Sequence, residues 1–236
     1  MTGRLELGTE EAKSSHDQRG KVMPPTPITV DPMYFVSAHE AGHAVAYIMA
    51  HRALERDYPS FRRVFIRREF SSPYIDDRNR KVDCIGMCEA PDLYNVNIGL
   101  GLFYQEPEPC PGWQNQMLRK MEWTILTSLA GPFAESASRD ARSGAVMRHT
   151  ARRLCGGEDD YSCAAAVLLD LTKASKQRHR ISHFEDRTRD LVLNSWAAID
   201  ALAKTLLINE SLDYDSAYAV VEPLLEAPLD CFTFER

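Results

Sequence analysis

Two histidines and a glutamate near the start of the chain have types and a spacing that could hold a metal ion. They lie in the segment His39-Glu40-Ala41-Gly42-His43. Residues four apart on a helix lie on one face, so His39 and His43 would present both imidazoles side by side, one turn apart. Two ring nitrogens could then bind a single Zn²⁺ at about 2.0–2.1 Å.

Glu40 follows the first histidine, so its carboxylate could reach a water molecule bound to the same metal. It would act as general base in the attack on a peptide carbonyl and then pass the proton to the leaving amine. An HExxH segment also arises by chance, in helices that carry unrelated histidines and a glutamate. Here the motif lies on a predicted helix with apolar flanks, which is the context that favours a zinc hydrolase.

A catalytic zinc needs a third protein ligand and one open position, and the local motif does not supply the third ligand. The candidates elsewhere are the acidic run Glu158-Asp159-Asp160, the isolated Glu135 and the remaining histidines. His179 and His183 are also four residues apart. No glutamate follows the first of them and their surroundings are basic, which indicates a solvated pair at a helix end.

The residues around the motif predict the helix that must hold it, at about 32–54. Asp31 can cap the free N–H groups, and Pro32 suits the first helical position. Two strands are predicted next, at 62–68 and at 83–89. The stretch 91–111 contains four prolines and is expected to be a long surface loop.

The rest of the chain is expected to be helical, with a connection at 141–157 that could include a helical turn. The helices are predicted at about 113–138, 158–175, 185–209 and 211–226. A helix, short strands and then a helical bundle predict a mainly α fold with a small β-sheet.

The expected organisation is a mobile N-terminal arm at 1–30, which is polar and lacks periodicity, followed by one domain at 31–230. Within that domain we expect an active-site helix at about 32–54, a small sheet at about 62–89 and a helical bundle at about 113–226.

The composition argues against nucleic-acid binding and membrane insertion. The chain has 236 residues, of which 44% are hydrophobic, and a net charge of −6 with a pI of about 5.7. Its basic stretches are short and separated, whereas phosphate binding needs a clustered positive surface. No segment has the ~18 apolar residues of a membrane helix, and residues 1–30 do not resemble a signal peptide. We therefore expect a cytoplasmic protein whose six cysteines, which lack a CxxC pair, stay reduced.

Three segments, taken in order, resemble the zinc metallopeptidase domain of the FtsH-type family. Residues 37–44, SAHEAGHA, look like the HEAGHA signature of that family. Residues 129–135, LAGPFAE, resemble its Gly-Gly-Arg-x-Ala-Glu stretch, and residues 156–164, GGEDDYSCA, resemble its Gly-Ala-x-x-Asp-Leu-x-x-Ala stretch. The tail at 202–225 is similar to the closing helices of the family. The resemblance covers about residues 33–226 and is strongest at HEAGH.

This resemblance implies a zincin-like active-site helix followed by a helical bundle, with one zinc ion per chain. It implies an aspartate as third ligand, and the alignment places that ligand at Asp160, with Asp159 as the alternative if the alignment shifts by one residue. Glu135 matches a family glutamate near the site, where it could accept a ring N–H from a zinc-bound histidine. The other interpretation of Glu135 is a carboxylate on a helix surface.

The strand that contains Gly86 and Met87 acquires a role from the same resemblance. Zinc peptidases of this kind hold an extended substrate by adding it to a sheet edge near the metal, through main-chain hydrogen bonds. An ordinary structural hairpin is the other interpretation of this strand.

The chain also departs from the family. It has no G-x-x-x-x-G-K-[ST] phosphate loop, it is too short to hold the ATPase module, and it lacks the membrane segments of the family. The Gly-Gly-Arg step reads Gly131-Pro132-Phe133, and an insertion is indicated around 139–155.

The sequence therefore predicts an ATP-independent zinc metallopeptidase that acts on peptides or unfolded proteins. The alternative is a non-catalytic zinc protein that binds a peptide or partner, or that works with a separate ATPase. The family often works as rings of six, a property that depends on its ATPase part, so a homo-oligomer stays open.

Overall fold

The computed structural model describes residues 31–68, 74–75, 81–82, 84–97, 99–104, 110–140, 142–154 and 158–225. The arm expected at 1–30 lies outside these residues. The described residues all belong to one compact unit that begins at Asp31.

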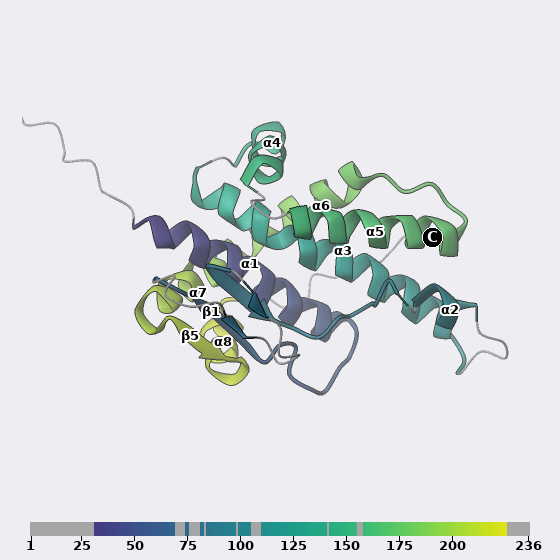
Figure 1. Ribbon diagram of the computed structural model, residues 1–236, viewed down its shortest axis with the longest axis horizontal. Coiled ribbons are helices and arrows are strands. Elements are labelled where there is room, and N and C mark those ends of the chain that lie inside the picture. Colours follow the sequence, from purple (N-terminus) through teal and green to yellow (C-terminus); the bar gives the residue numbers. More distant parts are fainter. Residues whose placement is uncertain are drawn as a thin grey trace, which may run out of the picture. The chain divides into compact units, whose positions relative to one another are not determined.

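A long helix, α1 (Pro32–Ala53), carries the HEAGH motif and is largely buried. It begins as the sequence predicts, because the side chain of Asp31 accepts a hydrogen bond from the N–H of Met33 at 2.9 Å. Figure 1 shows α1 between α3 on one side and α7 and α8 on the other. Burial on several sides makes α1 the central element, which explains why small residues such as Ala41 and Ala44 recur along it.

The helix α3 (Trp113–Ser138) lies antiparallel against α1, since His39 contacts Glu135 near one end of the pair and Ala53 contacts Arg119 near the other. The two backbones approach closely at Gly42. A β-carbon at position 42 would lie 2.6 Å from Cβ of Ala134. Gly42 therefore allows the close approach of the helices at the level of the histidines.

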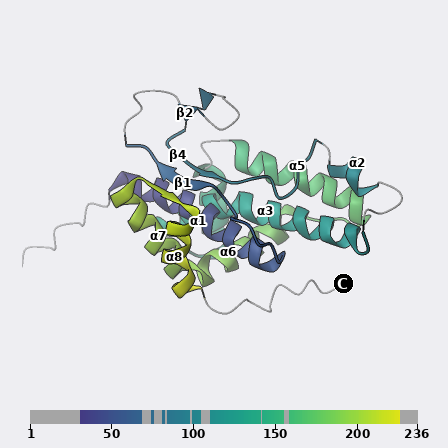
Figure 2. The same ribbon diagram turned by 90° about the horizontal axis from the view of Figure 1, so that it is seen from below.

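A small antiparallel sheet packs beside α1, as Figure 2 shows for β1 and β4. Its strand order is β4-β1-β5, and the strands are β1 (Arg63–Ile66), β4 (Gly86–Glu89) and β5 (Ser211–Asp213). Phe65 pairs with Met87 on one side and with Ser211 on the other. A separate two-stranded hairpin consists of β2 (Tyr74–Ile75) and β3 (Lys81–Val82).

The remaining elements are helical. They are α2 (Gly99–Phe103), α4 (Gly144–Leu154), α5 (Glu158–Ser175), α6 (Ile181–Asn194), α7 (Trp196–Asn209), α8 (Tyr214–Val221) and a 3₁₀ turn (Glu222–Leu224). The expectation of a mainly α fold with a small sheet is confirmed.

The single helix predicted at 185–209 is wrong, because the chain breaks at Ser195 into α6 and α7 with a bend of 71°. The bend allows α6 to pack on α3 while α7 packs on α1. Ser195 is buried at the break, and its hydroxyl lies 3.3 Å from the sulfur of Met49. The start of the helix predicted at 211–226 is also wrong: residues 211–213 pair with β1 before α8 begins.

Two regions expected to be a connection and a loop contain helices, although the sequence allows a helical turn in the first. The connection at 141–157 includes α4, whose Arg148 and Arg152 bind Asp186 and Glu185 of α6. These tertiary ion pairs are not visible in the local sequence. The loop expected at 91–111 includes the short α2.

Across the described residues, no single helix has the length and apolar character of a membrane span. The helices α6 and α7 reach that length and composition only when they are taken together across their bend.

Candidate metal centre

The two histidines of the motif point to a common position. Their Nε2 atoms lie 3.2 Å apart, and their ring centroids are separated by 4.9 Å. Both side chains are mostly buried, with exposed fractions of 18% for His39 and 12% for His43. The four-residue spacing on α1 thus produces the convergence expected of it.

Asp160, near the start of α5, approaches the same position. Its Oδ2 lies 3.2 Å from Nε2 of His39 and 3.6 Å from Nε2 of His43. Ligand atoms about 2.05 Å from a tetrahedral zinc are separated by about 3.3 Å. The three separations lie close to that value, so the three atoms have the spacing of three corners of a zinc site.

The other ring nitrogen of each histidine is occupied. Nδ1 of His43 lies 2.7 Å from the carbonyl oxygen of Thr127, which can only accept a hydrogen bond. His43 therefore carries its proton on Nδ1 in the neutral state, and its Nε2 presents a lone pair. Pro132, four residues after Ser128, has no N–H to give to the carbonyl of that residue, so the helix ladder of α3 is interrupted next to Thr127.

Glu135 fixes the second ring. Its Oε2 lies 3.1 Å from Nδ1 of His39, so the carboxylate accepts a hydrogen bond from Nδ1–H, and Nε2 is left to face the common position. The other oxygen accepts a hydrogen bond of 2.8 Å from Arg139, whose guanidinium lies 4.0 Å from the ring of Phe35. Glu135 is therefore held in place from both sides.

Gly131 makes room for both imidazoles. A β-carbon at this position of α3 would lie 2.6 Å from Cδ2 of His43 and 2.8 Å from Cδ2 of His39. A side chain there would displace one ring or separate α3 from α1. The sequence shows Gly131 within a matched segment, but not the contact that requires it.

Glu40 lies between α1 and β4. It is 8% exposed, and its pKa is raised by burial, although the neighbouring histidines and a hydrogen bond from the backbone of Cys88 oppose the shift. A β-carbon at Gly86 would lie 2.7 Å from Cγ and 2.8 Å from Oε1 of Glu40. The first residue of β4 therefore leaves space for this carboxylate.

The field of the carboxylates favours positive charge at the centre. Burial acts to lower the pKa of His39, but hydrogen bonds with Asp160 and Glu135 outweigh it and raise that pKa to about 10. The pKa of Asp160 is lowered, because the two histidines outweigh the effect of burial. A site that stabilises a proton in this way also stabilises a metal cation.

A buried carboxylate that sequence reasoning missed supports the start of α5. Glu185 of α6 has no exposed surface and accepts two hydrogen bonds from Arg152, at 2.6 and 2.7 Å. It also accepts one from the hydroxyl of Tyr161 at 3.2 Å. Because Tyr161 directly follows Asp160, this network ties the third candidate ligand to α4 and α6.

The strand with Gly86 and Met87 forms one edge of the three-stranded sheet, since β4 pairs with β1 and with no other described strand. Its residues are half-buried.

The alternative ligand Asp159 has a side chain outside the described part of the structure. The described cysteines, which are Cys84, Cys88, Cys110 and Cys163, are free thiols.

Comparison with known proteins does not identify a family. No protein-family model matches the chain, and no curated protein is significantly similar to it in sequence.

Proposed function

We propose that this chain is an ATP-independent zinc metallopeptidase, with His39, His43 and Asp160 as the zinc ligands. The observation that carries the proposal is the convergence of three lone-pair atoms on one position. Both Nδ1 protons are donated elsewhere, so two Nε2 lone pairs and a carboxylate oxygen face one another at 3.2–3.6 Å. Such an arrangement is repulsive unless positive charge lies among its atoms, either a proton on Nε2 of His39, whose pKa is raised to about 10, or a metal cation that replaces it.

A bound zinc ion would lower the pKa of a water molecule and polarise the carbonyl under attack. In this scheme the carboxylate of Glu40 accepts a proton from the attacking water and delivers it to the leaving amine. Burial raises its pKa above the usual value of a glutamate, which strengthens it as a base. Glu135 and the carbonyl of Thr127 keep the two imidazoles in the tautomer that the ligand role needs.

The edge of β4 supports a peptide as substrate. An extended chain added to this edge would form main-chain hydrogen bonds, which do not depend on its side chains. Because Gly86 lies against Glu40, a chain held there would run close to the proposed base. We therefore propose peptides or unfolded segments as the substrate class.

A non-catalytic zinc protein that binds a peptide or partner is the second candidate. The near-complete burial of Glu40 and its hydrogen bond from Cys88 favour it, because a group held in this way could be structural.

Zinc analysis and hydrolysis of unfolded casein distinguish the two candidates. The purified chain should contain about one zinc, and His39→Ala should lose it. Glu40→Gln should keep zinc and fold but hydrolyse casein at least about 100-fold more slowly, since it removes the base. A chelator should abolish hydrolysis, and added zinc should restore it. Equal hydrolysis by wild type and Glu40→Gln would contradict the mechanism, and a zinc-loaded wild type without activity would favour the second candidate.

A further inference from the structure

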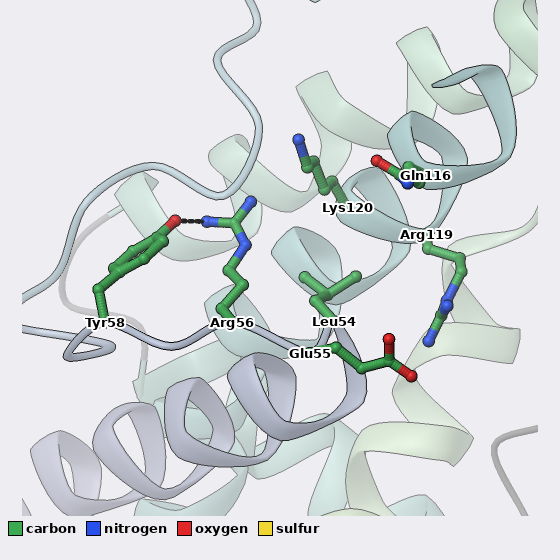
Figure 3. A pocket seen from close by; sticks show the side chains of 7 residues that line it. All are labelled: Leu54, Glu55, Arg56, Tyr58, Gln116, Arg119 and Lys120. Carbon is green, nitrogen blue, oxygen red and sulfur yellow. Dashed lines mark hydrogen bonds between the residues drawn. The ribbon is translucent and has the colours of Figure 1, made fainter. Parts of the chain in front are cut away.

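Among the described residues, a concave site lies beyond the far end of α1, away from the metal centre. It is a cavity of about 480 Å³ between the segment that follows α1 and the first half of α3. Figure 3 shows Arg56 and Tyr58 on one side, Arg119 and Gln116 on the other, and Lys120 between them. Along α1, Ala53 lies ten residues beyond His43, which corresponds to about 15 Å.

The charge of this pocket is opposite to that of the whole chain. Three cationic side chains line it, from Arg56, Arg119 and Lys120, against one carboxylate from Glu55. The chain as a whole has a net charge of −6. An excess of positive charge in a hollow of an acidic protein is a local feature that its average composition does not predict.

Lys120 is the least compensated of these cations. Its side chain is half-buried, and among the described residues its ammonium group has no hydrogen bond or ion pair. Its ammonium lies 5.3 Å from the ring of Trp113, and its pKa is lowered by burial and by the nearby Arg56. A charge that is partly removed from water and faces another cation is stabilised by an anion.

The two arginines have partners but retain unused donors. Arg56 donates to the hydroxyl of Tyr58, and Arg119 donates to the carbonyl of Ala53 at the end of α1. Each guanidinium has five N–H groups, so both can still donate to a ligand. Support of the α1 terminus explains Arg119, because cations stabilise a helix C-terminus, but it does not explain the position of Lys120.

We propose that this pocket binds a doubly charged oxyanion, of which a phosphate group is the simplest example. Such an anion matches the excess of two positive charges in the lining. The two arginine forks supply directional hydrogen bonds, and Lys120 supplies a point charge. The cavity is larger than a phosphate ion, so the ligand is a larger molecule that carries this group.

Inorganic phosphate titrated into the full chain tests this proposal, with chloride as compensating salt at constant ionic strength. The side-chain NMR signal of Lys120, in protein with labelled lysine, should shift and saturate. Lys120→Met and Arg119→Met should each weaken phosphate binding by at least about tenfold, since each removes a charged hydrogen-bond donor. Acetate at the same ionic strength should bind at least about tenfold more weakly than phosphate, because it carries a single charge.

Lys204→Met is the matched control. Lys204 lies on α7, where it pairs with Asp200 at 2.6 Å, so this variant also removes one lysine but leaves the pocket intact. It should bind phosphate as the wild type does. Lys120→Met should keep the melting temperature of the wild type, and both pocket variants should keep its zinc content. A Lys120 signal that does not saturate, equal binding of acetate, or an equal loss in Lys204→Met would overturn the proposal. None of these results depends on peptidase activity.

Discussion

At the scale of single residues, the imidazoles of His39 and His43 can serve as ligands because their Nδ1 atoms are occupied elsewhere. The spacing of the motif predicts that both rings share a face. It contains no sign of the carbonyl of Thr127, because any residue type has that group. Gly131 has a comparable role, since it is needed for the space that it leaves rather than for any atom that it supplies.

Gly131→Ala should weaken zinc binding by at least about tenfold, because the new methyl group would displace one of the two imidazoles. Competition with a coloured chelator measures this affinity. Gly101→Ala is the control, since a β-carbon at position 101 meets no atom within 4 Å. Equal zinc affinity in both variants would mean that the rings do not pack on Gly131.

At the scale of elements, the start of α5 depends on α4 and α6 through the buried Glu185. Arg152→Met would leave this carboxylate buried with the hydroxyl of Tyr161 but without its cation. We expect a loss of about 2 kcal/mol in the free energy of unfolding, reduced from the value for a fully buried pair because Arg152 is half-exposed. Zinc affinity should fall as well, since the network adjoins Asp160.

Arg148→Met provides the comparison, because it also removes an arginine of α4 that pairs with α6. The carboxylate of Asp186 is about half-exposed, whereas that of Glu185 is fully buried, so the loss should stay below about 1 kcal/mol, with little change in zinc affinity. Urea unfolding and the zinc competition assay measure both effects. If the two variants behave alike, Glu185 has no special part in positioning Asp160.

The sequence predicts α1, α3 and α5 well because each has a local cause. Asp31 and Pro32 start α1, and the long apolar pattern of α3 continues through Pro132. The sequence does not predict the break at Ser195. The helices α6 and α7 pack on different helices, and only the assembled core requires the bend. The convergence of His39 and His43, in contrast, can be predicted, since their spacing on one helix is a local property.

At the scale of the whole molecule, stability should depend on pH through Glu122 of α3. Burial raises its pKa to about 7, although Arg187 and Arg119 oppose the shift. The folded state therefore holds this proton more tightly than the unfolded state, whose value is 4.5. The contribution of Glu122 to stability is full below about pH 4.5 and is lost as the pH rises to about 7.

Glu122→Gln should remove this dependence. Relative to the wild type, the variant should gain about 1–2 kcal/mol in unfolding free energy between about pH 4.5 and 8, less than the full shift implies, because the group is partly exposed. Urea unfolding at both pH values provides the comparison. A constant difference between the two proteins would contradict a raised pKa.

The central claim, a zinc ion held by two histidines and an aspartate, is tested most directly by X-ray absorption at the zinc edge of the zinc-loaded chain. We predict only nitrogen and oxygen neighbours of the zinc, at about 2.0–2.2 Å, together with the outer-shell scattering of two imidazole rings. In Asp160→Ala the oxygen neighbour from the carboxylate should be lost or replaced, while the scattering of both imidazole rings remains. A sulfur neighbour at about 2.3 Å would instead assign the metal to a cysteine such as Cys88. Such a neighbour without imidazole scattering would contradict the site described for His39, His43 and Asp160.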